Sequence, residues 1–455
     1  MHPMSRVVDP VLGLMRILLG GYRREITNMS WLFFDRFLRV LGNFLIGIAA
    51  ARLLGPADYG GISYAQALTA LMTLIASLGL NQVVVKRLID HPLEATTTLG
   101  TAFTLQAVAT GLTMVVALGV ALLTRSDDSY AALIAILTIS IVIRPTEVFR
   151  YWFEANVNAR RAVIADNISF LISGTIKIAV LFLYRSVEAF AWTLVIEQLF
   201  GGICLYVAYR TDNSRPGRWH IDPATLWRLV VDTWPLFLSG LAVVIYMRID
   251  QFVIMATHGA AETGIYAAAV RLSEIFYVLP TIVATSFFPR WQSMMAESSD
   301  QHQLAVRSTM TAMIAVSIAI SLIMSVAAGP FVHLLYDARY DRAVPVLAIH
   351  IWTSVFVSMG ILGNQWYLSH NLQSRTLLCT ILGAVSNFAI NLALVPSMGA
   401  VGGAIASLAA QIIATFLADA FSSRTRPLFL LKAHALFWPF EWLWRRVSRS
   451  AGTTH

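Results

Sequence analysis

Long apolar runs alternate with short polar segments along almost the whole chain. Each run holds roughly 20 residues, the length that an α-helix needs to cross a hydrocarbon core about 30 Å thick. Ten-residue segments of alternating polarity, which are typical of membrane β-barrels, do not occur in the sequence. The pattern therefore predicts an all-α polytopic membrane protein.

Twelve spans are predicted, and a longer polar segment in the middle divides them into two sets of six. The spans are residues 31–51, 62–80, 99–122, 131–149, 164–184 and 187–208, then 234–256, 265–288, 309–328, 344–368, 376–395 and 401–421. This division predicts an N-lobe (31–208), a cytoplasmic linker (209–233) and a C-lobe (234–421). The flanking parts are an interfacial N-terminal segment (1–30) and a basic, Trp-rich interfacial tail (422–455).

Composition and charge fit this interpretation. Hydrophobic residues make up 57% of the chain and charged residues 13%, against about 25% charged residues in soluble domains. Most of the 33 Lys and Arg residues fall on one side if the termini and the even-numbered connections share that side. The positive-inside tendency then places both termini in the cytoplasm. The net charge of +8 reflects this topology, and its scatter over many loops argues against nucleic-acid binding.

One short turn sequence occurs twice in the chain. "GPADYG" occupies residues 55–60 and "GAAETG" residues 259–264, and the resemblance continues into the flanking spans at a nearly constant offset. Such a repeat predicts two pseudo-symmetric six-helix lobes, related by an axis along the membrane normal, around a central cavity. The glycines permit backbone angles closed to other residues, and we expect Asp58 and Glu262 to cap the helix that follows.

Three stretches resemble a known family. They are "WLFFDRFLRVLGNFLIGIAAARLLGPADYGGISYA", "RIDQFVIMATHGAAETGIYAAAVRLSEIFYVLP" and "GAVGGAIASLAAQ". The chain from about residue 28 to 422 is similar to the Wzx-type oligosaccharide flippases of the multidrug/oligosaccharidyl-lipid/polysaccharide exporter superfamily.

This resemblance implies a transporter rather than an enzyme, in the bacterial inner membrane. It would move undecaprenyl-diphosphate-linked oligosaccharide repeat units from the cytoplasmic to the periplasmic leaflet by alternating access, for exopolysaccharide, capsule or O-antigen synthesis. The implied partners are the lipid bilayer, the lipid-linked oligosaccharide, and a polysaccharide polymerase with its export machinery.

Arginines inside the spans are the predicted ligands of the substrate. Ionisable groups at membrane depth are costly unless they face a cavity or a partner. A guanidinium group can hold two phosphate oxygens at once. We therefore predict that the diphosphate and sugar meet four arginines of the first, seventh and eighth spans: Arg36, Arg39, Arg248 and Arg271.

Five other intramembrane charges have two interpretations. Asp35, Lys177, Glu197, Asp250 and Glu274 either pair internally or take part in coupling to H⁺ or Na⁺. Lys177 and Glu197 fall on neighbouring spans, which favours a pair as much as an exchange site. No other cofactor and no metal site is predicted.

The end of the fourth span carries the run "RPTEVFRYWFE". Arg144, Glu147, Arg150 and Glu154 lie three and four residues apart, so ion pairs along one helix end are expected more than capture of a headgroup. Pro145 is expected to kink this span.

Motifs of several enzyme classes are missing from the sequence. There is no Walker motif, H-E-x-x-H, pair of Cys ligands or nucleophile elbow. The longest outer connection, "PFVHLLYDARYDRAVP", leaves little room for the active site of a polymerase or glycosyltransferase and is expected to be a surface helix or a gate. A multidrug exporter and a lipid II exporter of the same superfamily stay open as alternatives.

Overall fold

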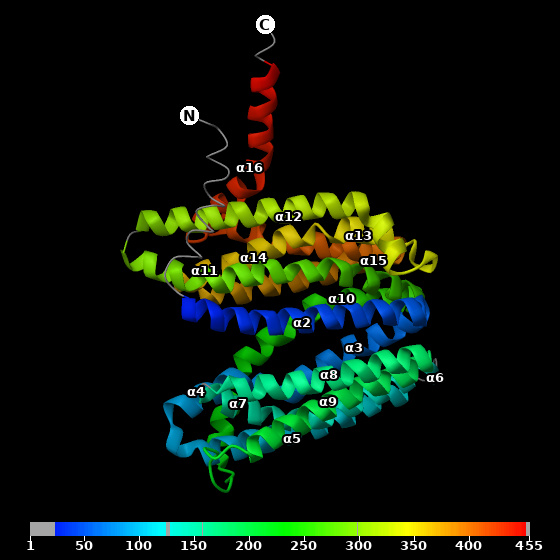
Figure 1. Ribbon diagram of the computed structural model, residues 1–455, viewed down its shortest axis with the longest axis vertical. Helices are drawn as coiled ribbons and strands as arrows, with labels where there is room; N and C mark the ends of the chain where they lie inside the picture. The colour runs from blue at the N-terminus through cyan, green and yellow to red at the C-terminus, as the bar shows by residue number, and fades with distance from the viewer. Residues whose placement is uncertain (1–22, 124–127, 157, 298, 452–455) are drawn as a thin grey trace. The chain divides into compact units, whose positions relative to one another are not determined.

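The computed structural model describes residues 23–123, 128–156, 158–297 and 299–451. It describes the backbone alone at residues 23–38, 120–123, 128–129, 159, 288–290, 292–293, 295–297, 299–302, 373 and 439–451. The described chain is helical, with turns and short loops between the helices and no strand (Figure 1). Most of the N-terminal segment predicted from the sequence, residues 1–22, lies outside the described residues.

The helices account for the predicted number of spans. In the described residues, 9 helical runs are long and apolar enough to cross a membrane. Two of them, Pro223–Phe287 and Ser374–Phe421, have 65 and 48 residues, about twice the length of a span. Each contains a glycine with non-helical backbone, Gly259 (φ 78°) and Gly399 (φ 56°). Division at these glycines gives two more helices, and α2 (Arg23–Leu54) completes the twelve.

The chain forms two compact units. Unit 1 consists of residues 1–44, 268–334 and 340–455, and unit 2 of residues 45–267 and 335–339. Division at the linker into lobes of residues 31–208 and 234–421 stays a prediction. Each unit is described below by itself.

Unit 2 holds the helices of the first half and the seventh span. After the end of α2 come α3 (Pro56–Ser77), α4 (Leu80–Asp90), η1 (Pro92–Glu94), α5 (Ala95–Leu123), α6 (Asp128–Ile139), η2 (Ser140–Thr146), α7 (Glu147–Ala155), α8 (Ala159–Leu183), α9 (Val187–Arg210) and most of α10 (Pro223–Glu274). α8 and α9 pack side by side along their length (Figure 1). The 3₁₀ segment η2 contains Pro145, so the fourth span is not a regular α-helix there, and the kink expected at Pro145 stays a prediction.

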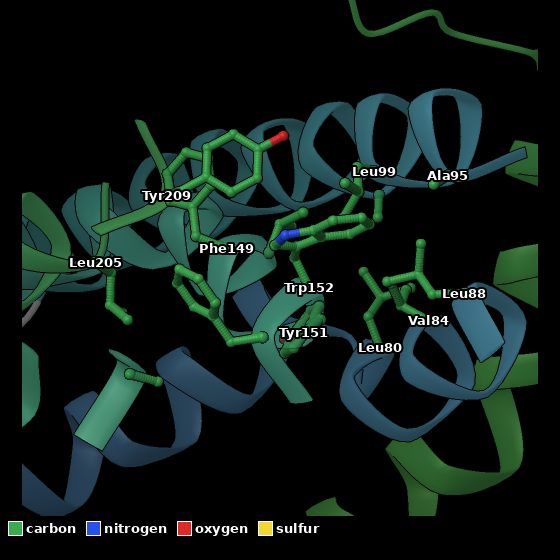
Figure 2. Close-up of a cluster of buried hydrophobic side chains, with 14 of the residues drawn as sticks. Leu80, Val84, Leu88, Ala95, Leu99, Phe149, Tyr151, Trp152, Leu205 and Tyr209 are labelled. Carbon is green, nitrogen blue, oxygen red and sulfur yellow. The ribbon is translucent and has the colours of Figure 1, made fainter. Parts of the chain in front are cut away.

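Unit 2 contains a buried aromatic and aliphatic cluster (Figure 2). α7 contributes Phe149, Tyr151 and Trp152, which pack with leucines of α4 and α5 and with Tyr209 of α9. Trp219, from the segment predicted to be a linker, packs against this cluster, and its Nε1 donates a hydrogen bond to the Tyr209 hydroxyl (3.0 Å). This segment is therefore attached to unit 2, and α10 already begins at Pro223.

The two copies of the repeated turn meet inside unit 2. Gly55 (φ 88°) and Gly259 (φ 78°) have nearly the same left-handed backbone conformation. Residues other than glycine rarely adopt this conformation. A Cβ on Gly60 would lie 1.8 Å from the Ala260 carbonyl oxygen, and one on Gly264 would lie 1.9 Å from that of Pro56. The two helices thus cross backbone on backbone, in a reciprocal contact.

The expected capping role of Asp58 is wrong. Gly55 is the N-cap of α3, and no side chain makes the capping hydrogen bond there. Asp58 lies inside the first turn of α3 and is exposed, whereas Glu262 is buried. The left-handed glycine starts the helix one turn before the carboxylate, so the carboxylate is too late in the helix to cap it.

Unit 1 holds the last turns of α10 and the helices that follow. These are η3 (Ile275–Tyr277), α11 (Val278–Glu297), α12 (Ser299–Leu335), α13 (Ala343–His350), α14 (Thr353–Ser369), α15 (Gln373–Thr415), η5 (Leu417–Phe421) and α16 (Arg426–Ala451), with η4 (Ala338–Tyr340) at the connection between α12 and α13. The tenth predicted span is therefore broken between α13 and α14.

Serines of α12 compensate for this break. Ser321 Oγ donates to the Ile351 carbonyl oxygen (3.2 Å), and Ser325 Oγ donates to that of Ala348 (3.0 Å). One turn earlier, Ser317 Oγ contacts the hydroxyl of Ser358 (2.8 Å). Polar backbone groups in a membrane are stable only when they are hydrogen-bonded, and this serine stripe adds hydrogen bonds at the break.

A buried cation attaches α16 to unit 1. Lys432 is 1% exposed, and its Nζ donates to Asp419 Oδ2 (2.7 Å) and to the Thr415 carbonyl oxygen (2.7 Å). The Tyr367 hydroxyl donates to the other oxygen of Asp419. The tail was expected to lie at the lipid headgroups, but its first turns pack on protein, and the side chains of Trp442 and Arg445 are outside those described.

The glycine crossing predicts a specific loss of stability. Gly264→Ala places a methyl group against backbone that cannot rotate away. We expect it to lower the free energy of unfolding by about 1–3 kcal/mol, as overpacking does, measured by thermal unfolding of the purified protein. Gly111→Ala is the matched control, because nothing lies within 4 Å of its Cβ position. Equal unfolding temperatures for the two variants would contradict a tight crossing.

Candidate functional site

The structure places the four predicted arginines in different surroundings. Arg36 and its neighbour Asp35 lie outside the described side chains. Arg39 and Arg271 are half-buried in unit 1, as is Glu274. Arg248 is half-buried in unit 2, on the part of α10 before Gly259, and makes no hydrogen bond or ion pair within the described part of the chain. A guanidinium group at membrane depth that has no internal partner is suited to bind an anion.

Asp250 lies two residues after Arg248 and has an internal partner. The side chain is 4% exposed, and the Tyr266 hydroxyl donates a hydrogen bond to its Oδ2 (2.7 Å). Tyr266 follows the second copy of the repeated turn. This contact joins the seventh and eighth spans on either side of Gly259.

Lys177 and Glu197 form an ion pair between α8 and α9. Lys177 Nζ lies 2.5 Å from Glu197 Oε2, and the two side chains are 4% and 22% exposed. The structure shows these two residues paired with each other, which is one of their two interpretations. Exchange of a proton or Na⁺ at Glu197 would have to break this pair.

Arg144, Glu147 and Arg150 of the fourth span form a network as expected, whereas Glu154 makes no ion pair among the described residues. Arg150 donates to Glu147 Oε2 (3.0 Å) and also to both oxygens of Asp166 on α8 (2.7 and 2.9 Å). Arg144 donates to Gln198 Oε1 on α9 (3.1 Å) and lies 3.7 Å from Glu147. Sequence spacing indicated the pairs within the helix. It could not indicate Asp166 or Gln198, because these partners come from other helices.

Two aspartates that sequence reasoning missed occupy similar settings in the two halves. Asp212, just after α9, accepts a hydrogen bond from Trp152 Nε1 (3.0 Å) and lies 3.6 Å from Arg161. Asp419, after α15, accepts from Tyr367 and binds Lys432. Each aspartate thus joins the end of the sixth helix of its half to an aromatic residue of the fourth. The signal in the sequence was the aromatic pair at 151–152 and at 366–367.

Hydrogen bonding favours the ionised form of Asp212. Burial opposes ionisation, but hydrogen bonds from Trp152 and Ser214 outweigh it and hold the pKa below its ordinary value of 3.8. A carboxylate with a lowered pKa stabilises the folded state above its ordinary pKa.

The family of the chain follows from comparison with known proteins. Residues 26–295 match the family model described as polysaccharide biosynthesis protein. The chain belongs to this family. It is also 24% identical over 263 residues to the probable flippase AglR of Haloferax volcanii, in a match that covers 54% of this chain and 52% of that protein. The chain spans about half the length of this curated relative.

Solved structures show the same fold. The lipid II flippase MurJ in an inward closed conformation gives a TM-score of 0.71 at 13% identity, covering 90% of this chain and 91% of MurJ. An inward-facing multidrug resistance MATE family transporter of the MOP superfamily gives 0.66 at 13% identity, with coverage of 86% and 95%. The twelve-helix, two-lobe fold class and the family resemblance expected from the sequence are therefore confirmed.

The Lys177–Glu197 pair predicts unequal effects of single and double substitutions. Removal of one partner of a fully buried ion pair costs about 3–5 kcal/mol, because a charge is left uncompensated. We expect less here, since Glu197 is 22% exposed. Glu197→Met alone should lower the unfolding temperature more than Lys177→Met and Glu197→Met together. Additive losses in thermal unfolding would mean that the two side chains do not stabilise one another.

The lowered pKa of Asp212 predicts an acid-dependent contribution to stability. Because the folded-state pKa lies below 3.8, this contribution is present at neutral pH and is lost as the pH falls through the folded-state value. The difference in unfolding temperature between the wild type and Asp212→Asn should stay constant down to about pH 5 and shrink below it. A constant difference down to about pH 3 would rule out this role.

Proposed function

We propose that this protein is a flippase that moves undecaprenyl-diphosphate-linked oligosaccharide repeat units from the cytoplasmic to the periplasmic leaflet. Three findings support the proposal. The chain belongs to the polysaccharide biosynthesis protein family, the matched relative is named a probable flippase, and the fold is shared with a lipid II flippase. In this proposal the protein is a transporter with alternating access and not an enzyme.

Arg248 is the observation that carries the substrate assignment. Its guanidinium group is half-buried within a span and makes no hydrogen bond or ion pair with the described residues. An unpaired charge at such a depth is costly, and a lipid-linked diphosphate would supply two negative charges with a geometry that arginine fits. Arg36, Arg39 and Arg271 are proposed to take part in the same recognition.

We further propose that transport is coupled to H⁺ or Na⁺ through Glu197 or Asp250. Both carboxylates have internal partners, Lys177 and Tyr266. Protonation of the carboxylate, or binding of a cation to it, would therefore replace its internal partner. We propose that this exchange accompanies a step of the transport cycle. Glu274 and Asp35 remain further candidates for this role.

The proposed setting is the bacterial inner membrane, with both termini in the cytoplasm. Contacts among the turns support the assignment of sides. Within unit 2, the turns at Gly55 and Gly259, both expected on the outer side, are followed by helices that cross each other. On the other side, Arg87 after the second span donates to Thr225 of the linker region (3.3 Å). A polysaccharide polymerase and export machinery would receive the translocated unit.

Export of drugs is the alternative function, and it is favoured by the fold that the chain shares with the MATE family transporter. Purified protein in proteoliposomes can be given a lipid-linked oligosaccharide in one experiment and a fluorescent cationic drug in another. Translocation of the lipid without efflux of the drug is expected. Drug efflux without lipid movement would overturn the proposed function.

Arg248 provides a test of the substrate contact. In the proteoliposome assay, Arg248→Gln should lower the translocation rate about tenfold or more, and Arg248→Lys should restore part of it, because lysine keeps the charge but not the fork. Arg218→Gln is the control, since Arg218 is exposed in the linker region. Wild-type rates in Arg248→Gln protein of normal stability would exclude this residue from substrate binding.

A further inference from the structure

The connection between α12 and α13 leaves one compact unit and enters the other. Residues up to 334 and from 340 onward belong to unit 1, but Leu335–Arg339 belongs to unit 2. Tyr336 and Tyr340, at the two ends of this connection, are each 0% exposed. We call residues 335–339 the strap. Asp337 and Arg339, which lie between the two buried tyrosines, are 33% and 52% exposed.

Within the strap, Asp337 fixes the direction of the Arg339 side chain. Arg339 Nη2 lies 2.6 Å and Nε lies 2.9 Å from Asp337 Oδ2, and the backbone N–H of Arg339 donates to Asp337 Oδ1 (2.9 Å). These hydrogen bonds hold the pKa of Asp337 below its ordinary value despite partial burial. The guanidinium group is thus held in one orientation by an ionised carboxylate.

This guanidinium group contacts the end of α2. Arg339 Nη2 donates to the carbonyl oxygen of Arg52 (2.7 Å), which lies in the last turn of α2. Carbonyl groups in the last turn of a helix have no partner inside the helix and carry the negative end of its dipole. Gly55 begins the turn that follows α2. A Cβ at Gly55 would lie 2.7 Å from Arg339 Nη1. The absence of a side chain at Gly55 therefore makes room for the arginine.

The contact lies beside the helix crossing of the repeated turn. Gly55 is the N-cap of α3, and five residues further Gly60 is buried against the second copy. All of these turns are on the side that the sequence assigns to the outside. The crossing is a contact of backbones, whereas the Arg339 bond is polar and half-exposed, so water can replace it.

We propose that Arg339 is a releasable latch on the outer side: bound to the Arg52 carbonyl it holds the α2–α3 turn against the strap, and its release accompanies opening to the outside. The inference rests on the proposed alternating-access transport. It assigns to the strap a gating role that a purely structural cap of α2 would not have. Asp337 is a positioning residue, because it acts through Arg339.

A labelling experiment tests the latch without any substrate. Ala260 is 6% exposed and packs at the crossing, so a cysteine there is shielded while the crossing is intact. Cys204 and Cys379 are first replaced by serine, and full-length protein in proteoliposomes is treated with a membrane-impermeant maleimide from either side. Ala57→Cys is the matched control, because Ala57 is exposed one turn from the same crossing.

We expect Arg339→Gln to raise the labelling rate of Ala260→Cys from the outer side about tenfold, the change expected when one charge-assisted hydrogen bond is lost. Asp337→Asn should raise it less, and Arg339→Lys less than Arg339→Gln, while labelling of Ala57→Cys stays the same. An unchanged labelling rate of Ala260→Cys in Arg339→Gln would overturn the latch.

A structural cap gives a different result: a lower unfolding temperature and faster labelling of both cysteines, which would also overturn the proposal. Failure of the proposed function would give a different result from failure of the latch. In that case the labelling response to Arg339→Gln is present, but wild-type protein moves no lipid-linked oligosaccharide.

Discussion

A backbone without a hydrogen-bonding partner is costly in a hydrocarbon layer, and this constraint governs the structure. Straight helices meet it internally, but several spans of this chain are broken. At the break between α13 and α14, serines of α12 bind the carbonyl oxygens of Ala348 and Ile351. At the end of α2, a guanidinium group binds the Arg52 carbonyl. At Gly60 and Gly264, which lie inside helices, the absence of a side chain lets the two backbones approach closely.

The same constraint explains which predictions from sequence succeeded. Twelve apolar runs and one repeated turn were enough to indicate the class of fold, because length and periodicity are local properties. The left-handed conformation of Gly55 and Gly259 was also expected, since glycine is the residue that adopts it readily. Asp58 was misplaced as a cap because the exact start of a helix depends on backbone angles that composition does not determine.

Partners of charged residues were the part that sequence could not supply. Arg150 and Glu147 share a helix, so their spacing indicated a pair, but Asp166 comes from another helix. Lys432 lies in the tail that was predicted to be interfacial, and its acceptor Asp419 lies in a separate segment. In the sequence, Arg339 is one of several charged residues of a predicted outer loop. In each case the acceptor is set by tertiary structure, and no local pattern records it.

The paired aspartates carry a consequence for how the repeat diverged. Asp212 takes its cation from Arg161, which precedes it on α8, whereas Asp419 takes its cation from Lys432, which follows it on α16. The carboxylate and its aromatic donor thus have the same places in both halves, and the positive charge does not. α16 therefore supplies to the second half a cation that the first half takes from one of its own spans.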